Sequence, residues 1–192
     1  VDDLVARGLP VRIAGRSQER LIALSEAHGG LDWVVADVKD PGSVGRAAGG
    51  ASVLVTTVGP YTWWGRIAAE AAIDHAIPYI DITGEPAFLR DVFEKFGPRA
   101  AAAGVAMLPS IGYDYVPGNL AGALALEAAG AEARSVAIGY FLSSDNPRTR
   151  KSFSDGTLRS LRASGGAEQF RWHHGRIEAE RAAKRVLKFD LG

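Results

Sequence analysis

The residues that could bind a phosphate follow the first apolar run of the chain. Gly15, Arg16 and Ser17 stand between "VRIA" (11–14) and a helical pattern that begins at about Gln18. An arginine beside a helix N-terminus is electrostatically unfavourable unless an anion joins it, so a bound phosphate would give Arg16 a function. An ordinary solvated arginine in a turn is the alternative interpretation.

Two later turns carry further candidates for ligand binding. Asp37 follows "WVVA" (33–36), where its side chain could reach an adenine ring or could simply form a turn. Val58 ends the run "VLVTTV" (53–58), and Gly59 and Pro60 follow it. Gly59 would let the backbone approach the nicotinamide half of a dinucleotide, and Pro60 would stiffen that turn.

Two tyrosines could supply a proton. Tyr61 and Tyr113 each follow an expected strand, and reduction of a polarised double bond needs an acid near the developing negative charge. Either tyrosine could instead be structural. The neighbouring Trp63 and Trp64 could line a pocket or fill a core. Glu85 could similarly do no more than cap the helix that begins at Pro86.

The elements that must position these residues alternate along the chain. Short β-branched runs separate longer helical patterns, which predicts a doubly wound, Rossmann-like parallel sheet with ligands outside the carboxyl ends of its strands. The expected strands are 11–14, 33–36, 53–58, 79–82 and 105–108. A further run, "SVAIGYFL" (135–142), breaks this rhythm and predicts another layer.

Local signals mark where the helices begin, end and pack. Ser17 can cap a helix from Gln18, Asp40 with Pro41 can begin another, and Gly104 can end the helix before residue 105. The segment 85–96 shows one apolar helical face, which must pack on a sheet. That face comprises Phe88, Leu89, Val92, Phe93 and Phe96.

The early position of "VRIA" indicates a missing first strand. In the strand order 3-2-1-4-5-6, this run corresponds to the second strand, and "VDDLVARG" (1–8) corresponds to the end of the preceding helix. We therefore expect an N-terminally incomplete dinucleotide-binding domain over 1–132, lacking its first strand and glycine-rich loop. Residues 133–192 would begin a mixed α/β substrate or dimerisation domain. A differently ordered sheet that starts at "VRIA" is the alternative.

Composition narrows the classes of protein. The 192 residues are 47% hydrophobic and 23% charged, with no signal peptide or long apolar run, so a cytoplasmic protein without membrane insertion is expected. The absence of cysteine excludes disulfides, and His173 and His174 lack plausible partners for a metal site. Residues 148–192 hold 11 Lys and Arg against 5 Asp and Glu, but no nucleic-acid reader motif is present.

Four stretches together resemble the saccharopine dehydrogenase-like oxidoreductases, in the branch that includes mycobacterial trans-acting enoyl reductases. They are "AGRSQERL" (14–21), "TTVGPYTWWG" (56–65), "YIDITGE" (79–85) and "GYDYVPGNLAGALALE" (112–127), and "SDGTLRSL" (154–161) is similar to a later segment. The resemblance implies an NADP-binding Rossmann domain followed by a substrate domain. The chain departs from many relatives at 112–119, where they read Gly-Phe-Asp-Ser-x-Pro-Ser-Asp.

The functional hypothesis is an NADP-dependent oxidoreductase that moves hydride between NADPH and an enoyl or carbonyl substrate. Arg16 in place of an acidic residue at the end of the second strand favours NADP over NAD. The substrate could be a small molecule or an acyl group on an acidic carrier protein, which the basic segment 148–192 would attract. A homodimer is one possible assembly. A catalytically silent NADP-binding scaffold is the alternative function.

Overall fold

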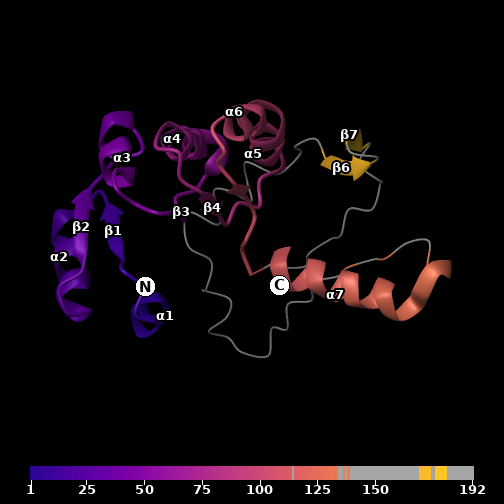
Figure 1. The fold of residues 1–192 in the computed structure, drawn as a ribbon, viewed down its shortest axis with the longest axis horizontal. Helices are drawn as coiled ribbons and strands as arrows, with labels where there is room; N and C mark the ends of the chain where they lie inside the picture. Colours follow the sequence, from indigo (N-terminus) through magenta and orange to yellow (C-terminus); the bar gives the residue numbers. More distant parts are fainter. Residues whose placement is uncertain (114, 134–135, 137, 139–168, 174–175, 181–192) are drawn as a thin grey trace, which may run out of the picture.

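The computed structural model describes residues 1–113, 115–133, 136, 138, 169–173 and 176–180 (Figure 1). The N-terminal half alternates helices and strands: α1 Asp2–Ala6, β1 Arg12–Gly15, α2 Gln18–Ala27, β2 Asp32–Val35, α3 Pro41–Ala48, β3 Leu54–Thr56 and α4 Tyr61–Asp74. Then follow β4 Tyr79–Asp81, α5 Pro86–Asp91, the π-helical turn η1 Val92–Phe96, α6 Gly97–Ala102, β5 Met107–Leu108, α7 Tyr115–Ala129, the 3₁₀ turn η2 Gly130–Glu132, β6 Gln169–His173 and β7 Arg176–Glu180.

The strands of this half are parallel, as the alternation predicts. β1 pairs with β2 from Arg12 opposite Asp32 to Gly15 opposite Val35. β3, β4 and β5 form a second parallel sheet in that order. Each strand is found where it was expected, although β3, β4 and β5 are shorter than the runs that predicted them. The Rossmann-like α/β class is therefore confirmed.

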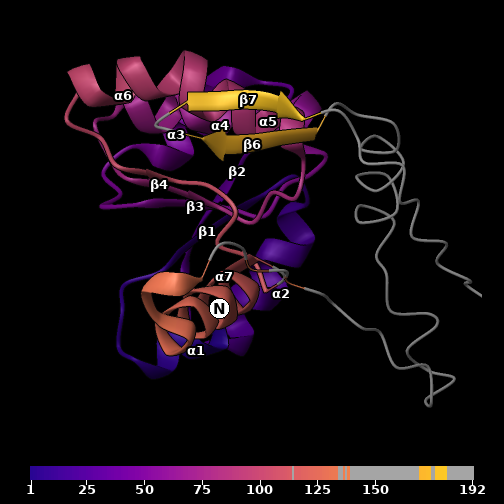
Figure 2. The same ribbon diagram turned by 90° about the vertical axis from the view of Figure 1, so that its right-hand side faces the viewer.

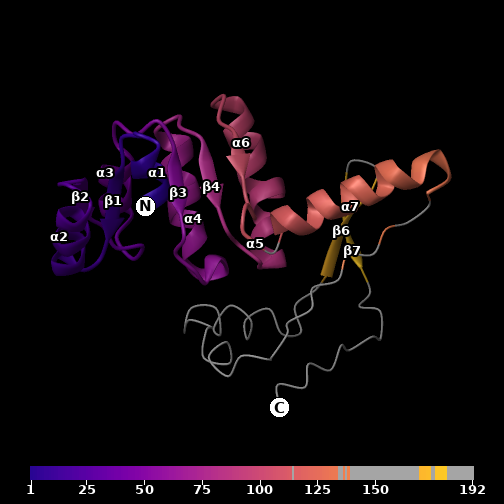
Figure 3. The same cartoon turned by 90° about the horizontal axis from the view of Figure 1, so that it is seen from below.

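The two parallel sheets are not joined to each other by strand pairing. Within the described part of the chain β1 pairs only with β2, and β3 pairs only with β4. Viewed from below, α1 lies across the region between β1 and β3 (Figure 3). Direct pairing of β1 with β3 would have contradicted a missing central strand, and it is not observed here. The missing strand itself stays a prediction.

Helices cover both sides of these strands. α3, α4, α5 and α6 lie on one side, whereas α1, α2 and α7 lie on the other (Figures 1 and 2). The main hydrophobic core lies between the first group and the sheet β3-β4-β5. It includes Ala69 and Ala72 of α4, Tyr79 of β4 and Phe88 of α5. Small residues on α4 let it pack closely: a Cβ at Gly65 would lie 2.6 Å from the Phe88 ring.

The local signals for helix ends are confirmed. Ser17 caps α2, where its Oγ accepts a hydrogen bond from the Arg20 N–H at 3.4 Å. Asp40 caps α3 by accepting from the Gly42 N–H at 3.0 Å, with Pro41 at the first helical position. Gly104 adopts a φ of +68°, a left-handed conformation that glycine reaches without steric cost, just beyond α6.

The apolar face predicted over 85–96 is only partly correct. Phe88, Val92 and Phe96 are buried in the core at the expected i, i+4, i+8 spacing. Phe93, however, is 52% exposed. Leu89, the residue one turn earlier on the same side, is only half-buried. The buried stripe is therefore one residue per turn, and the segment continues as a π-helical turn from Val92.

Much of the predicted second domain lies outside the described residues. This applies to most of "SVAIGYFL" and of the basic segment 148–192, so the domain boundary at 132/133 stays a prediction. The described exception is the antiparallel pair β6 and β7, in which Gln169 lies opposite Glu180 and His173 opposite Arg176. The backbone of β6 lies close to α5 (Figure 2).

Candidate functional site

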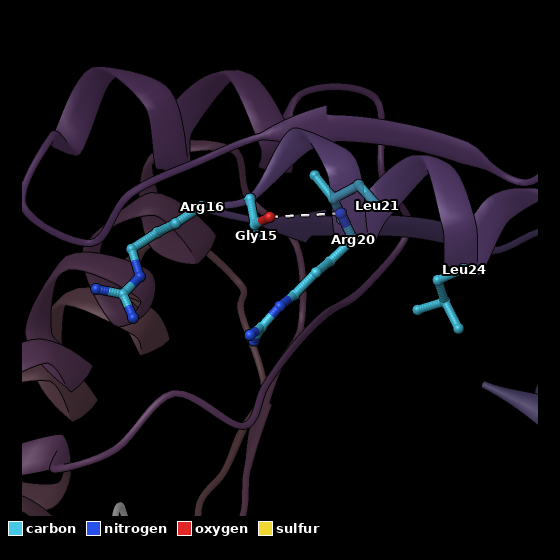
Figure 4. A pocket seen from close by; sticks show the side chains of 6 residues that line it. Gly15, Arg16, Arg20, Leu21 and Leu24 are labelled. Atoms are coloured by element: carbon cyan, nitrogen blue, oxygen red, sulfur yellow. Dashed lines mark hydrogen bonds between the residues drawn. The ribbon is translucent and has the colours of Figure 1, made fainter.

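The turn between β1 and α2 borders an open hollow of about 460 Å³. Gly15, Arg16, Ser17 and Arg20 line it together with two leucines of α2. Figure 4 shows the side chains of Arg16 and Arg20 extending away from the turn, each ending in its guanidinium group. The predicted residues Gly15, Arg16 and Ser17 therefore lie together at the carboxyl end of β1.

Positive charge accumulates at this hollow without local compensation. No described acidic side chain lies within ion-pair distance of Arg16 or Arg20, although Glu19 is in the same helical turn. The N-terminus of α2 adds its own partial positive charge. Arg20 was not among the predicted site residues. Its place in the first turn of α2, just after the strand end, is the signal that could have identified it.

Gly15 is not required by packing alone. A Cβ added there would meet the Leu21 side chain at 3.6 Å, which is an ordinary van der Waals contact, and the backbone is not left-handed. A glycine at this position leaves the strand end unobstructed for a ligand. Its predicted contact with a cofactor stays a prediction.

Asp37 forms a local turn after β2. Its Oδ1 accepts a hydrogen bond from the Lys39 N–H at 2.9 Å, and its own N–H donates to Ser43 Oγ at 2.9 Å. The same hydroxyl donates to the Asp40 carbonyl at 2.7 Å. These contacts are those of a turn-forming aspartate, the alternative considered for this residue. Contact of Asp37 with an adenine ring stays a prediction.

The turn after β3 is exposed in its middle and anchored at its ends. Val58 is exposed and Pro60 is buried, and the Gly59–Pro60 peptide bond is cis. Tyr61 is buried, and its hydroxyl donates to the Thr56 carbonyl at 2.9 Å. Burial raises the pKa of Tyr61 well above its ordinary value, and the charges of Asp81 and Glu85 raise it further. The Tyr61 proton is thus held inside the turn.

Glu85 joins the β4–α5 turn to the first turn of α4. Only 2% of the residue is exposed. Oε1 accepts from the Tyr61 N–H at 2.7 Å, while Oε2 accepts from the Thr62 N–H at 2.9 Å and from Thr62 Oγ1 at 2.6 Å. Glu85 does stand at the N-cap position of the helix that begins at Pro86, but its side chain makes no capping bond to that helix. Glu85 instead caps a helix 24 residues earlier in the chain.

A second buried carboxylate joins the ends of β4 and β5. The Oδ1 of the fully buried Asp81 accepts from the Thr83 N–H at 2.8 Å and from the Ser110 N–H at 2.9 Å. Ser110 Oγ donates to the Thr83 carbonyl at 2.7 Å. These bonds hold Ser110 at a φ of +62°, a left-handed backbone conformation that residues other than glycine rarely adopt.

Asp81 and Tyr79 also leave two polar atoms without a described partner. Asp81 Oδ2 and the Tyr79 hydroxyl are both buried and make no hydrogen bond within the described structure. Burial raises the pKa of Tyr79 strongly, and the Asp81 carboxylate adds to that shift. Both groups lie on the face of β4 that packs against the core.

The aromatic candidates occupy different environments. Tyr113 is 88% exposed beyond the end of β5, and Trp63 is 58% exposed on α4. Trp64 is half-buried, with the Lys39 ammonium 5.7 Å from its ring centroid.

The candidate residues fall into two groups. Hydrogen bonds link the ends of β3, β4 and β5, whereas the arginine hollow lies at the end of a separate sheet.

Comparison with known proteins gives relatives for part of the chain. No family model matches it. A trans-acting enoyl reductase from Mycobacterium leprae is 38% identical over 114 residues, which cover 57% of this chain and 27% of the relative. A saccharopine dehydrogenase-like oxidoreductase from Bos taurus is 33% identical over 122 residues, 58% of this chain and 28% of the relative. The family resemblance is confirmed.

Other comparisons extend this result. A lipid droplet localized protein from Caenorhabditis elegans is 31% identical over 121 residues, 59% of this chain and 28% of the relative. Among solved structures, saccharopine dehydrogenase (L-Glu forming) from Saccharomyces cerevisiae matches with a TM-score of 0.54 at 22% identity, covering 64% of this chain and 26% of that one, which supports the fold. The chain matches little more than a quarter of the length of these curated relatives. Within the described residues, no helix is long and apolar enough to span a bilayer.

Proposed function

We propose that the chain is part of an NADP-dependent oxidoreductase that transfers hydride between NADPH and an enoyl or carbonyl substrate. The observation that carries this proposal is the pair of arginines at the carboxyl end of β1. Arg16 and Arg20 border an open hollow and have no ion-pair partner within the described region. The confirmed resemblance to oxidoreductases supports the reaction class.

The donor set of the hollow fits a nucleotide phosphate. Two guanidinium groups offer several N–H donors in planar arrays, which match the oxygens of the 2′-phosphate of NADP. An NAD-specific domain would usually place a carboxylate at this strand end to bind the free ribose hydroxyl. Arg16 and Arg20 would hold the phosphate, and the Val58–Gly59 backbone would face the nicotinamide. When bound, the cofactor supplies hydride.

Tyr113 is the better of the two tyrosine candidates for the proton that accompanies hydride. Its side chain is exposed beyond β5, where a substrate can reach it, whereas the Tyr61 hydroxyl is buried and donates to Thr56. Tyr113 would donate its hydroxyl proton to the atom that gains negative charge and recover a proton from solvent. Tyr113→Phe should then lower turnover at least tenfold without weakening NADPH binding.

Titration of the full-length protein with NADPH and NADH tests the cofactor assignment. We expect a clear preference for NADPH, and Arg16→Ala should lose about 1.5–3 kcal/mol of NADPH binding free energy, roughly 10- to 100-fold in affinity. Arg20→Ala should lose less, about threefold to tenfold, because its guanidinium lies one helical turn further on. NADH affinity should not change in either variant.

Arg46→Ala is the matched control, since Arg46 is an exposed arginine of α3 near Asp40 and outside the hollow. It should bind NADPH like the parent protein. Equal affinity for the two dinucleotides, or an Arg16→Ala variant that keeps full NADPH preference, would contradict the NADP assignment. NADPH binding without turnover on enoyl or carbonyl compounds would favour a silent scaffold.

The finer features of the substrate and assembly are also proposals. An acyl thioester on an acidic carrier protein would suit the basic segment 148–192, and the resemblance to a mycobacterial trans-acting enoyl reductase supports an enoyl group. Turnover of carrier-linked substrate should then fall with salt more steeply than turnover of the free thioester. Parallel salt curves would contradict carrier docking. We also propose a cytoplasmic homodimer, tested by cell fractionation and sedimentation.

A further inference from the structure

The segment between β3 and α4 is fixed at two points and open between them. At one end, the Tyr61 hydroxyl donates to the Thr56 carbonyl at 2.9 Å. At the other, the Pro60 carbonyl accepts from the N–H groups of Trp63 and Trp64 at 3.2 and 3.1 Å. Between these points Val58 is exposed, and its N–H contacts only the Thr56 side chain among the described residues, at 3.3 Å.

Glu85 controls where this segment meets α4. Its two carboxylate oxygens accept three hydrogen bonds, and all three donors belong to the residues directly after Pro60. A carboxylate at a helix N-terminus also offsets the positive end of the helix dipole. Because Glu85 is itself buried on the β4–α5 turn, it ties the orientation of α4 to the neighbouring strand.

The same carboxylate occupies the anion-binding groups of α4. The free N–H groups at a helix N-terminus commonly bind a phosphate, but the N–H groups of Tyr61 and Thr62 are already satisfied by Glu85. In this turn Val58 is exposed and Gly59 is half-buried. Their backbone is therefore available to an uncharged ring rather than to a phosphate.

We infer that Glu85 is a positioning residue, which presents the Val58–Gly59 backbone to the nicotinamide half of the cofactor without touching the cofactor itself. The inference rests on the proposed function. The two roles concern different halves of the dinucleotide: Glu85 acts on the nicotinamide half, and Arg16 acts on the half that carries the 2′-phosphate. Loss of Glu85 should weaken contacts at the nicotinamide end and leave contacts at the 2′-phosphate end unchanged.

Glu85→Gln tests this in the full-length protein, with NADPH and 2′,5′-ADP as the two ligands. The second ligand carries the 2′-phosphate and adenosine but no nicotinamide. Glutamine keeps the size of the side chain but replaces one acceptor oxygen by an NH₂ donor, which would face an N–H or a hydroxyl of α4. We expect NADPH affinity to fall about 5- to 20-fold and 2′,5′-ADP affinity to stay within about twofold, measured by calorimetry.

Thr62→Val gives a milder second variant. It removes only the 2.6 Å bond from the Thr62 hydroxyl and keeps both backbone bonds, so the loss of NADPH affinity should be about two- to fivefold. Glu94→Gln is the matched control, because Glu94 forms a surface ion pair with Arg90 at 2.8 Å, away from this turn. It should bind both ligands like the parent protein.

The outcomes separate the inference from the proposed function. Unchanged NADPH affinity in Glu85→Gln and Thr62→Val overturns the positioning role, while Arg16→Ala can still confirm the cofactor. Equal losses for NADPH and 2′,5′-ADP also overturn it, because they indicate a general structural defect. A parent protein that binds neither ligand overturns both the inference and the proposed function.

Discussion

The helices α2 and α4 each begin just after a parallel strand, β1 and β3 respectively, but their N-termini are stabilised in opposite ways. At α2 a neutral serine caps the helix and two arginines stand beside it without a described acidic partner. At α4 a buried carboxylate fills the first turn with three hydrogen bonds. The first arrangement is electrostatically incomplete without an anion, whereas the second contains its own. A helix N-terminus alone therefore does not identify a phosphate site.

The largest expected difference between the two regions concerns stability. Glu85→Ala should lower the free energy of unfolding by about 2–4 kcal/mol, since it leaves two N–H groups of α4 without their acceptor in a largely buried site. Arg16→Ala should change it by less than about 0.5 kcal/mol, because that side chain makes no described ion pair. Chemical denaturation measures the free energy of unfolding of both variants. Similar losses of stability in the two would contradict the proposed difference between the two helix ends.

Close packing of α4 on α5 should be nearly as sensitive. Gly65→Ala places a methyl group 2.6 Å from the Phe88 ring, which should cost about 1–3 kcal/mol of stability through overpacking. Gly45→Ala in α3 is the matched control: its Cβ would lie 3.8 Å from His75, so the variant should be as stable as the parent or slightly more stable. Thermal unfolding compares the two, and equal melting temperatures would refute the close contact.

The buried region should also respond to alkaline pH. The pKa of Tyr79 is raised in the folded state, so its stabilising contribution is complete below the unfolded pKa of about 10 and is lost as pH rises beyond it. Above pH 11 the stability of the parent protein should fall more steeply than that of Tyr79→Phe, by up to about 1.4 kcal/mol per pH unit. Denaturant midpoints between pH 9 and 12 measure this, and parallel curves would contradict the assignment.

The smallest expected effect concerns the cap of α2. Ser17→Ala should lower stability by about 0.5–1 kcal/mol, because the capping bond is long at 3.4 Å and the helix end is exposed. Saturating NADPH should increase this loss if the Ser17 hydroxyl contacts the phosphate, because the variant would then bind NADPH more weakly. Melting curves with and without NADPH measure both effects. A loss as large as that of Glu85→Ala would show that the two helix ends are not different after all.

Local chemistry made much of the fold predictable from the sequence. β-branched runs located the strands, and Ser17, Asp40 and Pro41 located the starts of α2 and α3, because these signals act over a few residues. The candidate Arg16 could be identified for the same reason. The exposure of Phe93 could not, since how much of an apolar helical face is covered depends on how the whole segment packs.

The hydrogen bonds of Glu85 and Asp81 could not be predicted from the sequence, for a related reason. Glu85 acts 24 residues back along the chain, and Asp81 acts 29 residues forward on Ser110. Nothing local distinguishes such a carboxylate from an ordinary helix cap. Only the parallel register of β3, β4 and β5 brings these residues to one edge of the sheet.

The left-handed backbone of Ser110 has a consequence for protein engineering. A search for stabilising changes would select glycine there, since glycine adopts a φ of +62° without steric cost. The same change would delete the hydroxyl that ties the β5 loop to Thr83, and Tyr113 lies only three residues further along that loop. Relief of backbone strain and loss of this hydrogen bond therefore act in opposite directions on stability, and Ser110→Gly would also free the loop that carries Tyr113, the proposed proton donor.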